Sequence, residues 1–169
     1  IPAPASEHEM VFGDGAAAVL VGEKPVAVEV EGSYSITSEL LDIWRRESGD
    51  TYYRTWEDRY ISHGYSQIIQ EAVSGLLNKY RLTPRDFTKA IIYAHDARTH
   101  RSIIPSLGFD PKTQIGETLY DRVGNTGAAM ALMMLVAALV AAKAGEKLLL
   151  AGYGDGGDAL VLRTTEQIG

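Results

Sequence analysis

Between residues 61 and 80, apolar residues recur at every third or fourth position, and most of the positions between them are polar or charged. This spacing places the apolar side chains on one face of an α-helix. We therefore expect residues 61–80 to form an amphipathic helix that lies on a sheet. The apolar positions of this face are Tyr65, Ile68, Ile69, Ala72, Val73, Leu76, Leu77 and Tyr80.

Short apolar runs predict the strands of that sheet. Residues 16–21 and 89–94 have the length and composition of strands that are buried on both faces. Residues 26–31 alternate valine with other residues, which is typical of a strand paired with the preceding run. Two further strands are expected at 147–151 and 159–163. Because the predicted strands alternate with helices, the chain is expected to form an α/β layered domain.

Capping residues and composition set the remaining boundaries. Thr83 followed by Pro84 is a helix cap with proline at the first helical position, so a helical turn precedes the strand at 89–94. A helix is expected at residues 100–107. Residues 38–60 are rich in charged and aromatic side chains, and there we expect short helical pieces rather than sheet.

The longest apolar run, residues 127–142, is rich in alanine. It is shorter than the roughly 18 to 20 residues that a helix needs to cross a bilayer. Small side chains also allow a helix to pack tightly between two layers of a protein. We therefore expect a buried Ala-rich helix that begins at Thr126, and not a membrane span.

The composition is that of one globular domain, with 169 residues of which 46% are hydrophobic and 22% charged. The net charge of -6 disfavours general binding to nucleic acid or to anionic membranes. The absence of cysteine excludes disulfides and cysteine-based zinc sites. We expect no metal and a cytoplasmic location. The start Ile-Pro-Ala-Pro, without methionine or an export signal, indicates a piece of a longer protein.

Two polar residues next to apolar elements are candidates for chemistry. His95 ends the predicted strand at 89–94, and Asn125 precedes the apolar helix. An imidazole and a carboxamide on neighbouring loops can donate hydrogen bonds to one carbonyl oxygen, as carbon–carbon bond formation on a thioester requires. Each residue also has a plainer interpretation, His95 as a histidine satisfied by its neighbours and Asn125 as a helix cap.

Residues 152–157 have the glycine spacing of a dinucleotide-binding fingerprint. That motif requires a helix after it, whereas here a strand is expected to follow. A strand-to-strand turn that allows close approach of a substrate or of another backbone is the better interpretation. Its Gly-Asp-Gly at 154–156 repeats the Gly-Asp-Gly at 13–15, and each precedes an apolar strand rich in alanine and valine, which is a weak sign of duplication.

Four motifs occur in a characteristic order: Phe-Gly-Asp-Gly-Ala-Ala-Ala at 12–18, Glu-Gly-Ser-Tyr-Ser at 31–35 with Asp-Ile-Trp-Arg-Arg at 42–46, Ala-His-Asp-Ala-Arg at 94–98, and Val-Gly-Asn-Thr at 123–126. They resemble the thiolase superfamily, in the branch of hydroxymethylglutaryl-CoA synthase and β-ketoacyl synthase III. The third resembles the catalytic-histidine motif, usually Pro-His-Gln-Ala-Asn, and the fourth the Gly-Asn-Thr motif. The second is most similar to archaeal-type hydroxymethylglutaryl-CoA synthases.

This resemblance implies a duplicated fold of two halves, each a mixed sheet covered by helices, which pack across a pair of buried helices. Residues 126–142 fit one of that pair. The chain would be a single thiolase-like C-terminal domain, residues 1–169, with residues 1–37 as closing strands of a missing N-terminal half. The nucleophilic cysteine and the glutamate base would lie in that half, so we expect the chain alone to be inactive.

The resemblance also implies roles for particular residues. In such an enzyme a cysteine takes an acyl group from acyl-CoA, and a second thioester condenses with it. His95 and Asn125 would hold one thioester oxygen, and Gly154 and Gly156 would lie near the other oxyanion site. The coenzyme A thioester is then a substrate, and no cofactor is expected.

Arg98, His100 and Arg101 are candidate contacts to the phosphates of coenzyme A, although plain solvated surface is an equal alternative. The family motif is altered here, because Asp96 and Arg98 replace its glutamine and asparagine. His100 stands where the synthases often carry a lysine that contacts coenzyme A. The substrate can therefore differ from that of the relatives.

The sequence does not distinguish between several possible partners. The acyl carrier is acyl-CoA or an acyl carrier protein, and a homodimer or hetero-oligomer is expected, as is usual in the superfamily. The alternative to an enzyme is a thiolase-like scaffold subunit, which the retained His95 and Asn125 speak against and the altered Asp96 and Arg98 leave open. Nucleic acid is not expected, since acidic residues outnumber the arginines among the aromatic residues at 44–60.

Overall fold

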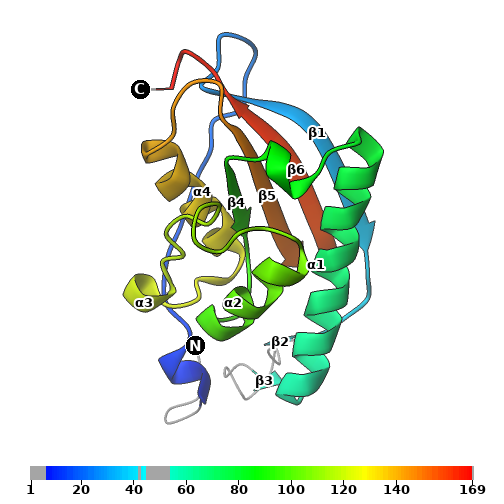
Figure 1. Ribbon diagram of the computed structural model, residues 1–169. Helices are drawn as coiled ribbons and strands as arrows, with labels where there is room; N and C mark the ends of the chain where they lie inside the picture. Colours follow the sequence, from blue (N-terminus) through cyan, green and yellow to red (C-terminus); the bar gives the residue numbers. More distant parts are fainter. Residues whose placement is uncertain (1–6, 42, 45–53, 169) are drawn as a thin grey trace.

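The computed structural model describes residues 7–41, 43–44 and 54–168 (Figure 1). Its centre is a four-stranded sheet in the order β1-β6-β5-β4. β4 (Lys89–Ile92) and β5 (Lys147–Gly154) are parallel. β6 (Gly156–Thr164) is antiparallel to β5 and to β1 (Val28–Thr37). This mixed sheet with its helices confirms the expected α/β fold class.

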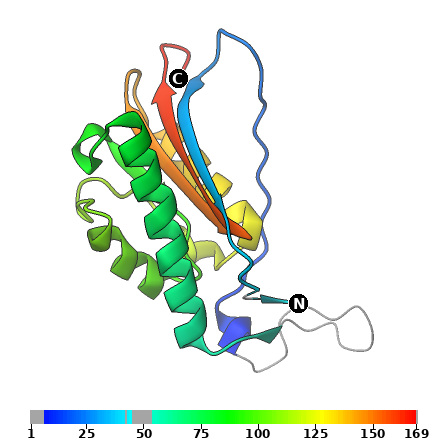
Figure 2. The ribbon, with the colours of Figure 1, turned by 90° about the vertical axis from the view of Figure 1, so that its right-hand side faces the viewer.

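Helices cover the two faces of the sheet, α1 on one side and α4 on the other (Figures 1 and 2). The central strand β5 is accordingly buried on both faces, with Leu148, Leu149 and Ala151 fully inaccessible to solvent. A strand covered on both faces has a continuous apolar run in place of an alternating pattern. The strands predicted at 89–94, 147–151 and 159–163 are therefore confirmed as β4, β5 and β6, with small changes at their ends.

The helix α1 (Asp58–Tyr80) confirms the amphipathic helix predicted at 61–80. The predicted apolar face packs on β1, β5 and β6, and Tyr65, Ile69 and Leu76 are completely buried. The helix ends where Arg81 adopts a left-handed conformation with φ 54° and donates its N–H to carbonyls of the last turn. The capped turn predicted after Thr83 is the 3-10 helix η2 (Pro84–Asp86).

The other helices are α2 (Ala97–Ser106), α3 (Tyr120–Val123), the 3-10 helix η3 (Gly127–Ala129) and α4 (Met130–Val140). On α4, one face is buried through Met130, Met134 and Leu135, whereas Val136 and Val140 are 43% and 85% exposed. The Ala-rich helix expected to be buried between two layers is thus covered on one side only by the described part of this chain.

Residues 38–60 differ from the short helical pieces that we expected. Their described part contains two strands of two residues each, β2 (Ile43–Trp44) and β3 (Arg54–Thr55), which pair with each other, and the first residues of α1. Residues 42 and 45–53 lie outside the described residues. A short 3-10 helix, η1 (Glu7–Met10), precedes this region in the chain.

The strand expected at residues 16–21 does not form, and this prediction is wrong for this chain. The segment has no partner strand among the described residues, and Leu20 and Val21 are 101% and 86% exposed. Figure 2 shows it, in blue, running apart from the strands of the sheet. We also expected residues 1–37 to be strands of another half, but the last ten of them form β1, which pairs with β6 of this chain's own sheet.

Candidate active site

His95 lies in the loop that leaves the end of β4 and leads to α2. The N–H of Tyr93 still donates to the Ala151 carbonyl of β5 at 2.9 Å. Beyond it, the N–H and the carbonyl of Ala94 both hydrogen-bond to the hydroxyl of Tyr120, each at 2.8 Å. A side chain thus holds the backbone at the point where strand pairing stops.

Asn125 lies in the turn between α3 and η3 and is 3% exposed. Its Oδ1 accepts the N–H of Gly127, the first residue of η3, at 2.8 Å, although the N-cap position itself is held by Thr126. Its Nδ2 donates to the carbonyl oxygen of His95 at 2.8 Å and to the hydroxyl of Tyr93 at 3.2 Å. The structure therefore brings the loops of His95 and Asn125 together through the asparagine side chain.

Glycines explain why the Phe-Gly-Asp-Gly and Gly-Asn-Thr motifs meet. The N–H of Asn125 donates to the Val11 carbonyl at 2.7 Å, and the N–H of Gly13 donates to the Asn125 carbonyl at 2.9 Å. A Cβ on Gly13 would overlap the carbonyl oxygen of Val123, and a Cβ on Gly124, whose φ is +69°, would lie 2.9 Å from that of Val11. Only glycine allows two backbones to approach this closely.

Three tyrosine rings surround the imidazole of His95. The ring centroids of Tyr65 and Tyr153 lie 5.0 and 5.1 Å from that of His95, both in edge-to-face geometry, and that of Tyr93 lies at 5.9 Å. Such aromatic contacts favour one orientation of the rings. Burial raises the pKa of Tyr65 well above its ordinary value, so this phenol remains a neutral hydrogen-bond donor.

Sequence reasoning missed these tyrosines as parts of the site. Tyr65 lies in the apolar stripe of α1, where it has the pattern of a core residue. Tyr153 lies within the glycine-rich segment, next to the glycines that drew attention. Neither position carries a signal in the sequence that relates it to His95, since the contact arises only when α1 and β5 pack together.

His95 lines a cleft of about 550 Å³ that also includes residues of α1, α2 and the segment after η1. Hydroxyl groups, two imidazoles and two arginines make up most of its polar lining. The lining residues besides His95 and Asp96 are Thr55, Ser62, Ser66, Thr99 and Ser102 with hydroxyl groups, then His8, Arg59 and Arg98, and then Val11, Phe12 and Ile61.

Asp96, which replaces the glutamine of the family motif, is the N-cap of α2. Its Oδ1 accepts the N–H of Thr99 at 2.8 Å, and its Oδ2 accepts the hydroxyl of the same residue at 3.0 Å. This cap starts α2 three residues earlier than we predicted. The substitution therefore has a structural function in this chain.

The three candidate phosphate contacts are placed differently. Arg98 lines the cleft, whereas Arg101 is exposed and lies outside the cleft lining. His100 is 4% exposed, with its ring centroid 5.9 Å from that of Tyr120. Burial, and secondarily the charge of Arg101, lowers the pKa of His100 to about 4, so this imidazole is neutral at neutral pH.

Gly154 and Gly156 form the tight turn between β5 and β6, which confirms the predicted strand-to-strand turn. Gly156 has φ +134°, and a Cβ there would overlap the carbonyl oxygen of Ile36 in β1. A Cβ on Gly154 would have no neighbour within 4 Å. The turn follows directly on Tyr153, whose ring contacts that of His95.

Comparisons with known proteins add an independent line of evidence. No model of a protein family matches the chain. A protein of Methanopyrus kandleri named hydroxymethylglutaryl-CoA synthase is 35% identical over 168 residues, which cover 98% of this chain and 48% of that protein. The protein of the same name in Archaeoglobus fulgidus is 31% identical, with the same coverage. The chain spans about half the length of the curated relatives it matches.

Solved structures agree. A 3-oxoacyl-(acyl carrier protein) synthase III from Pseudomonas aeruginosa superimposes with a TM-score of 0.74 at 17% identity, covering 99% of this chain and 55% of that one. The chain has a thiolase-like fold. A hydroxymethylglutaryl-CoA synthase complexed with CoA gives 0.71 at 14% identity, with 86% and 42% covered. The chain is therefore similar in sequence to proteins named hydroxymethylglutaryl-CoA synthase and similar in fold to thiolase-like enzymes, which is the resemblance that its motifs predicted.

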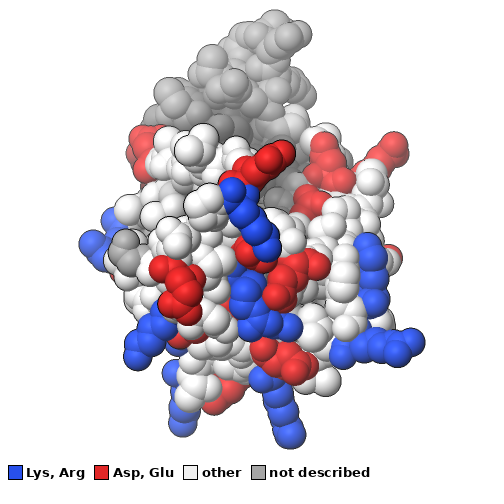
Figure 3. Space-filling model, turned by 90° about the horizontal axis from the view of Figure 1, so that it is seen from above, with Lys and Arg blue, Asp and Glu red and all other residues white. Residues whose placement is uncertain are grey.

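Some other site types find no support in the described part of the chain. None of its helices combines the length and apolar character needed to cross a membrane. Its histidine and acidic side chains form no group of three or more that could hold a metal ion. On the face seen in Figure 3, basic and acidic side chains are intermixed, unlike the broad basic surface of a nucleic-acid-binding protein.

Proposed function

We propose that this chain is the C-terminal part of an acyltransferase that forms a carbon–carbon bond between CoA thioesters, in the manner of hydroxymethylglutaryl-CoA synthase. One observation carries this proposal. Nδ2 of Asn125 donates to the backbone carbonyl of His95, 30 positions away, at 2.8 Å, and His95 lines a cleft of about 550 Å³. The sequence similarity to proteins named hydroxymethylglutaryl-CoA synthase supports the type of reaction.

In the proposed mechanism, His95 donates a hydrogen bond from one ring nitrogen to the oxygen of the bound thioester. Negative charge develops on that oxygen during condensation, and a donor that is already in place stabilises it without reorganisation. The rings of Tyr65, Tyr93 and Tyr153 restrict the orientation of the imidazole. Asn125 contributes the second donor by exchanging its longer hydrogen bond, 3.2 Å to Tyr93, for the thioester oxygen.

The acyl-carrying nucleophile has to come from elsewhere, because this chain contains no cysteine. We place it in a second half of the fold that covers residues 16–21 and the outer side of α4. The exposure of Leu20, Val21 and Val140, at 101%, 86% and 85%, supports such a cover. Without that half, the chain is inactive.

The cleft is suited to a thioester substrate with phosphate groups. Arg59 and Arg98 supply positive charge in a lining that is rich in hydroxyl groups. Arg98 is thus the retained candidate for a phosphate contact of coenzyme A. His100 is buried and neutral, so in this proposal it has no phosphate-binding role.

A β-ketoacyl synthase III-like enzyme that uses an acyl carrier protein is the second candidate. Its support is the superposition on 3-oxoacyl-(acyl carrier protein) synthase III over 99% of this chain. Transfer of labelled acetyl groups from acetyl-CoA to acetoacetyl-CoA, compared with condensation on a thioester of an acyl carrier protein, separates the two. A complete protein that lacks a cysteine nucleophile and transfers neither would instead favour a scaffold subunit.

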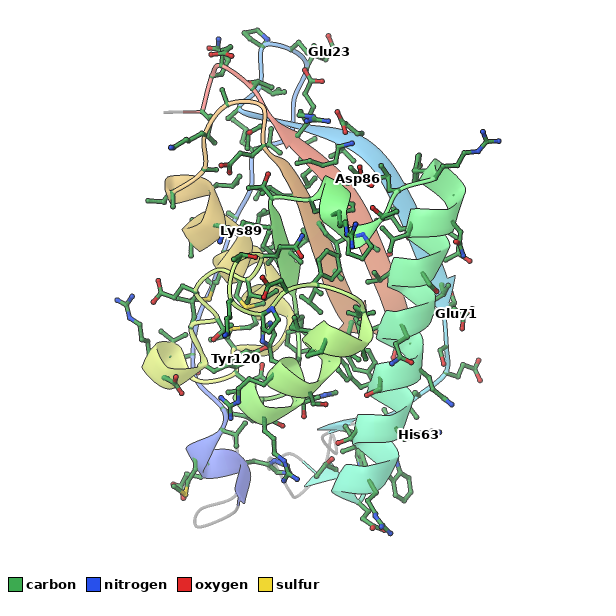
Figure 4. All side chains as sticks on the ribbon, in the orientation of Figure 1. Glu23, His63, Glu71, Asp86, Lys89 and Tyr120 are labelled. Carbon is green, nitrogen blue, oxygen red and sulfur yellow. The ribbon has the colours of Figure 1, made fainter. Side chains whose placement is uncertain are left out.

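The test of the proposed roles is His95→Ala in the complete protein. We expect condensation to fall by about 100-fold or more, because an oxyanion donor is lost, while acylation of the nucleophile remains detectable. His63→Ala is the matched control, since this exposed histidine of α1 (Figure 4) lies outside the cleft lining and its loss should change neither step. Unchanged condensation in His95→Ala would refute the role of that residue.

A further inference from the structure

The backbone that carries His95 is held by side chains from α1, from α3 and from the turn after α3. The carbonyl oxygens of residues 93–95 accept hydrogen bonds, in order, from the hydroxyl of Tyr65, the hydroxyl of Tyr120 and Nδ2 of Asn125. The three distances are 2.5, 2.8 and 2.8 Å. These side chains therefore hold the backbone just beyond the last residue of β4, where its pairing with β5 ends.

Among these side chains, Tyr120 makes two hydrogen bonds to one backbone residue. Its hydroxyl donates to the carbonyl of Ala94 and accepts the N–H of the same residue, so one phenol satisfies both backbone groups. A neighbouring strand provides the same pair of bonds to a residue inside a sheet. Burial raises the pKa of Tyr120 above its ordinary value, so the phenol retains the proton that it donates.

Tyr120 also connects the two motif loops. It is the first residue of α3, and its own carbonyl accepts the N–H of Gly124, the residue before Asn125. Leu119, directly before it, is held in the left-handed region with φ 64°, which is costly for a residue other than glycine. Figure 4 shows Tyr120 between α3 and α2. Through Tyr120, the four-residue helix α3 therefore binds the backbone of the His95 loop and also fixes the start of the Asn125 turn.

We propose that Tyr120 is a positioning residue that fixes the backbone of His95, and with it the imidazole, relative to Asn125. Its effect on catalysis rests on the proposed function, whereas its effect on the geometry of His95 does not. The catalytic effect is expected to be large for a residue that touches no substrate, because a displacement of about 1 Å in a reacting group can cost about 100-fold in rate.

The variant Tyr120→Phe tests this role, because it keeps the ring beside His100 and removes only the hydroxyl. Tyr80→Phe is a closely matched control. The hydroxyl of Tyr80 accepts the N–H of Ser33 at 3.0 Å and donates to the carbonyl of the same residue at 3.3 Å, at the end of α1 farthest from the cleft-lining residues of that helix. Both variants therefore lose the same two kinds of hydrogen bond, and only one of them lies near His95.

In the complete protein, we expect Tyr120→Phe to lower kcat for condensation by about 10- to 100-fold and to leave KM and the acylation rate within about two-fold. Correlation spectra of the histidine rings, four of which belong to this chain, give a readout that needs no activity. The signal of His95, assigned with the His95→Ala variant, should shift in Tyr120→Phe and remain in place in Tyr80→Phe.

Two results overturn the proposal: a wild-type His95 signal and wild-type kcat in Tyr120→Phe, or equal losses in Tyr120→Phe and Tyr80→Phe. If the wild-type protein condenses no thioesters, the proposed function fails, and the His95 signal alone decides the role of Tyr120. Should Tyr120→Phe not fold, amide exchange in the wild-type protein decides instead. A clamped Ala94 amide should be protected like those of β4, and exchange at the rate of an open loop would refute the clamp.

Discussion

Two segments of this chain begin with the same Gly-Asp-Gly and continue into apolar residues, yet they have opposite environments. The segment that starts at Gly154 continues from Gly156 as β6, where Val161 is 1% exposed. The segment at residues 13–21 has no partner strand among the described residues, and Leu20 is 101% exposed. The difference lies in the neighbours, since β6 is bonded to β5 and β1 on its two sides. An apolar run becomes a buried strand only where the rest of the sheet is present.

Each Gly-Asp-Gly contains one glycine that lies against another backbone, the first glycine in residues 13–15 and the last in residues 154–156. A Cβ on Gly13 would overlap the carbonyl oxygen of Val123, and a Cβ on Gly156 would overlap that of Ile36. In both places glycine allows one backbone to press against another. Local packing thus explains Gly13 in the first segment and Gly156 in the second, whereas the burial of the apolar residues that follow depends on distant parts of the fold.

The largest expected difference between the segments is their response to a buried charge. Val161→Asp places a carboxylate in the core of β6, where burying an unpaired charge costs about 4 kcal/mol or more. Urea unfolding of the variant and of the wild-type chain measures this loss. A loss below about 1 kcal/mol would mean that the second segment is no more buried than the first.

Acid should weaken the sheet region next, because a buried histidine of α2 lies against β4. His100 shares a small gap with Ile91, Ile92 and Met134, and its pKa is lowered to about 4. The ordinary value in an unfolded chain is about 6.5, so as the pH falls the unfolded state takes up this proton first. Stability from this group is complete above about pH 6.5 and is lost towards pH 4, by about 3 kcal/mol in all.

Urea unfolding between pH 7 and pH 4 checks this prediction. The dependence on pH should be smaller in His100→Gln, which has no imidazole to protonate. His63→Gln, which removes an exposed histidine of α1, should keep the wild-type dependence. Parallel curves for the wild type and His100→Gln would show that His100 is not the responsible group.

The sequence predicted those elements whose burial is set by nearby residues. The apolar face of residues 61–80 and the cap at Thr83 are local patterns, and both are present as α1 and η2. The runs at 147–151 and 159–163 form strands as predicted, because the strands that pair with them belong to this chain. The run at 16–21 has an equally apolar pattern and was misjudged, because a hydrophobic pattern does not say whether a partner strand exists.

The candidate site was predictable only in part, for a similar reason. The motifs identified the loops of His95 and Asn125, which do meet in the structure. The burial of His100 could not be predicted, since its pocket is formed by β4, α4 and the residues before α3. The clamp by Tyr120 also has no local signal, because the hydroxyl and the backbone of Ala94 are 26 positions apart.

Alanine substitutions at the two glycines of the β5–β6 turn should have smaller effects on stability, and the two positions should differ from each other. Gly156→Ala should lower the free energy of unfolding by about 2 kcal/mol, since φ is +134° and the new Cβ would press on β1. Gly154→Ala, two residues away, should change it by no more than about 0.5 kcal/mol, because the space around it is open. Thermal or urea unfolding distinguishes them, and equal losses would show that close approach does not explain the glycine at 156.

The smallest effect on stability is expected for a substitution in residues 16–21. This substitution also tests whether another part of the complete protein covers the segment. Leu20→Asp should change the unfolding free energy of this chain by no more than about 0.5 kcal/mol, since its side chain is fully exposed. If the cysteine-bearing half covers residues 16–21, the same substitution should abolish its association with this chain, measured by co-elution of the two parts. A stable chain with lost association would support the cover, because the charge would then be buried only at the interface. Wild-type association would mean that the segment is exposed in the complete protein as well, and that the two Gly-Asp-Gly segments differ in function and not only in what surrounds them.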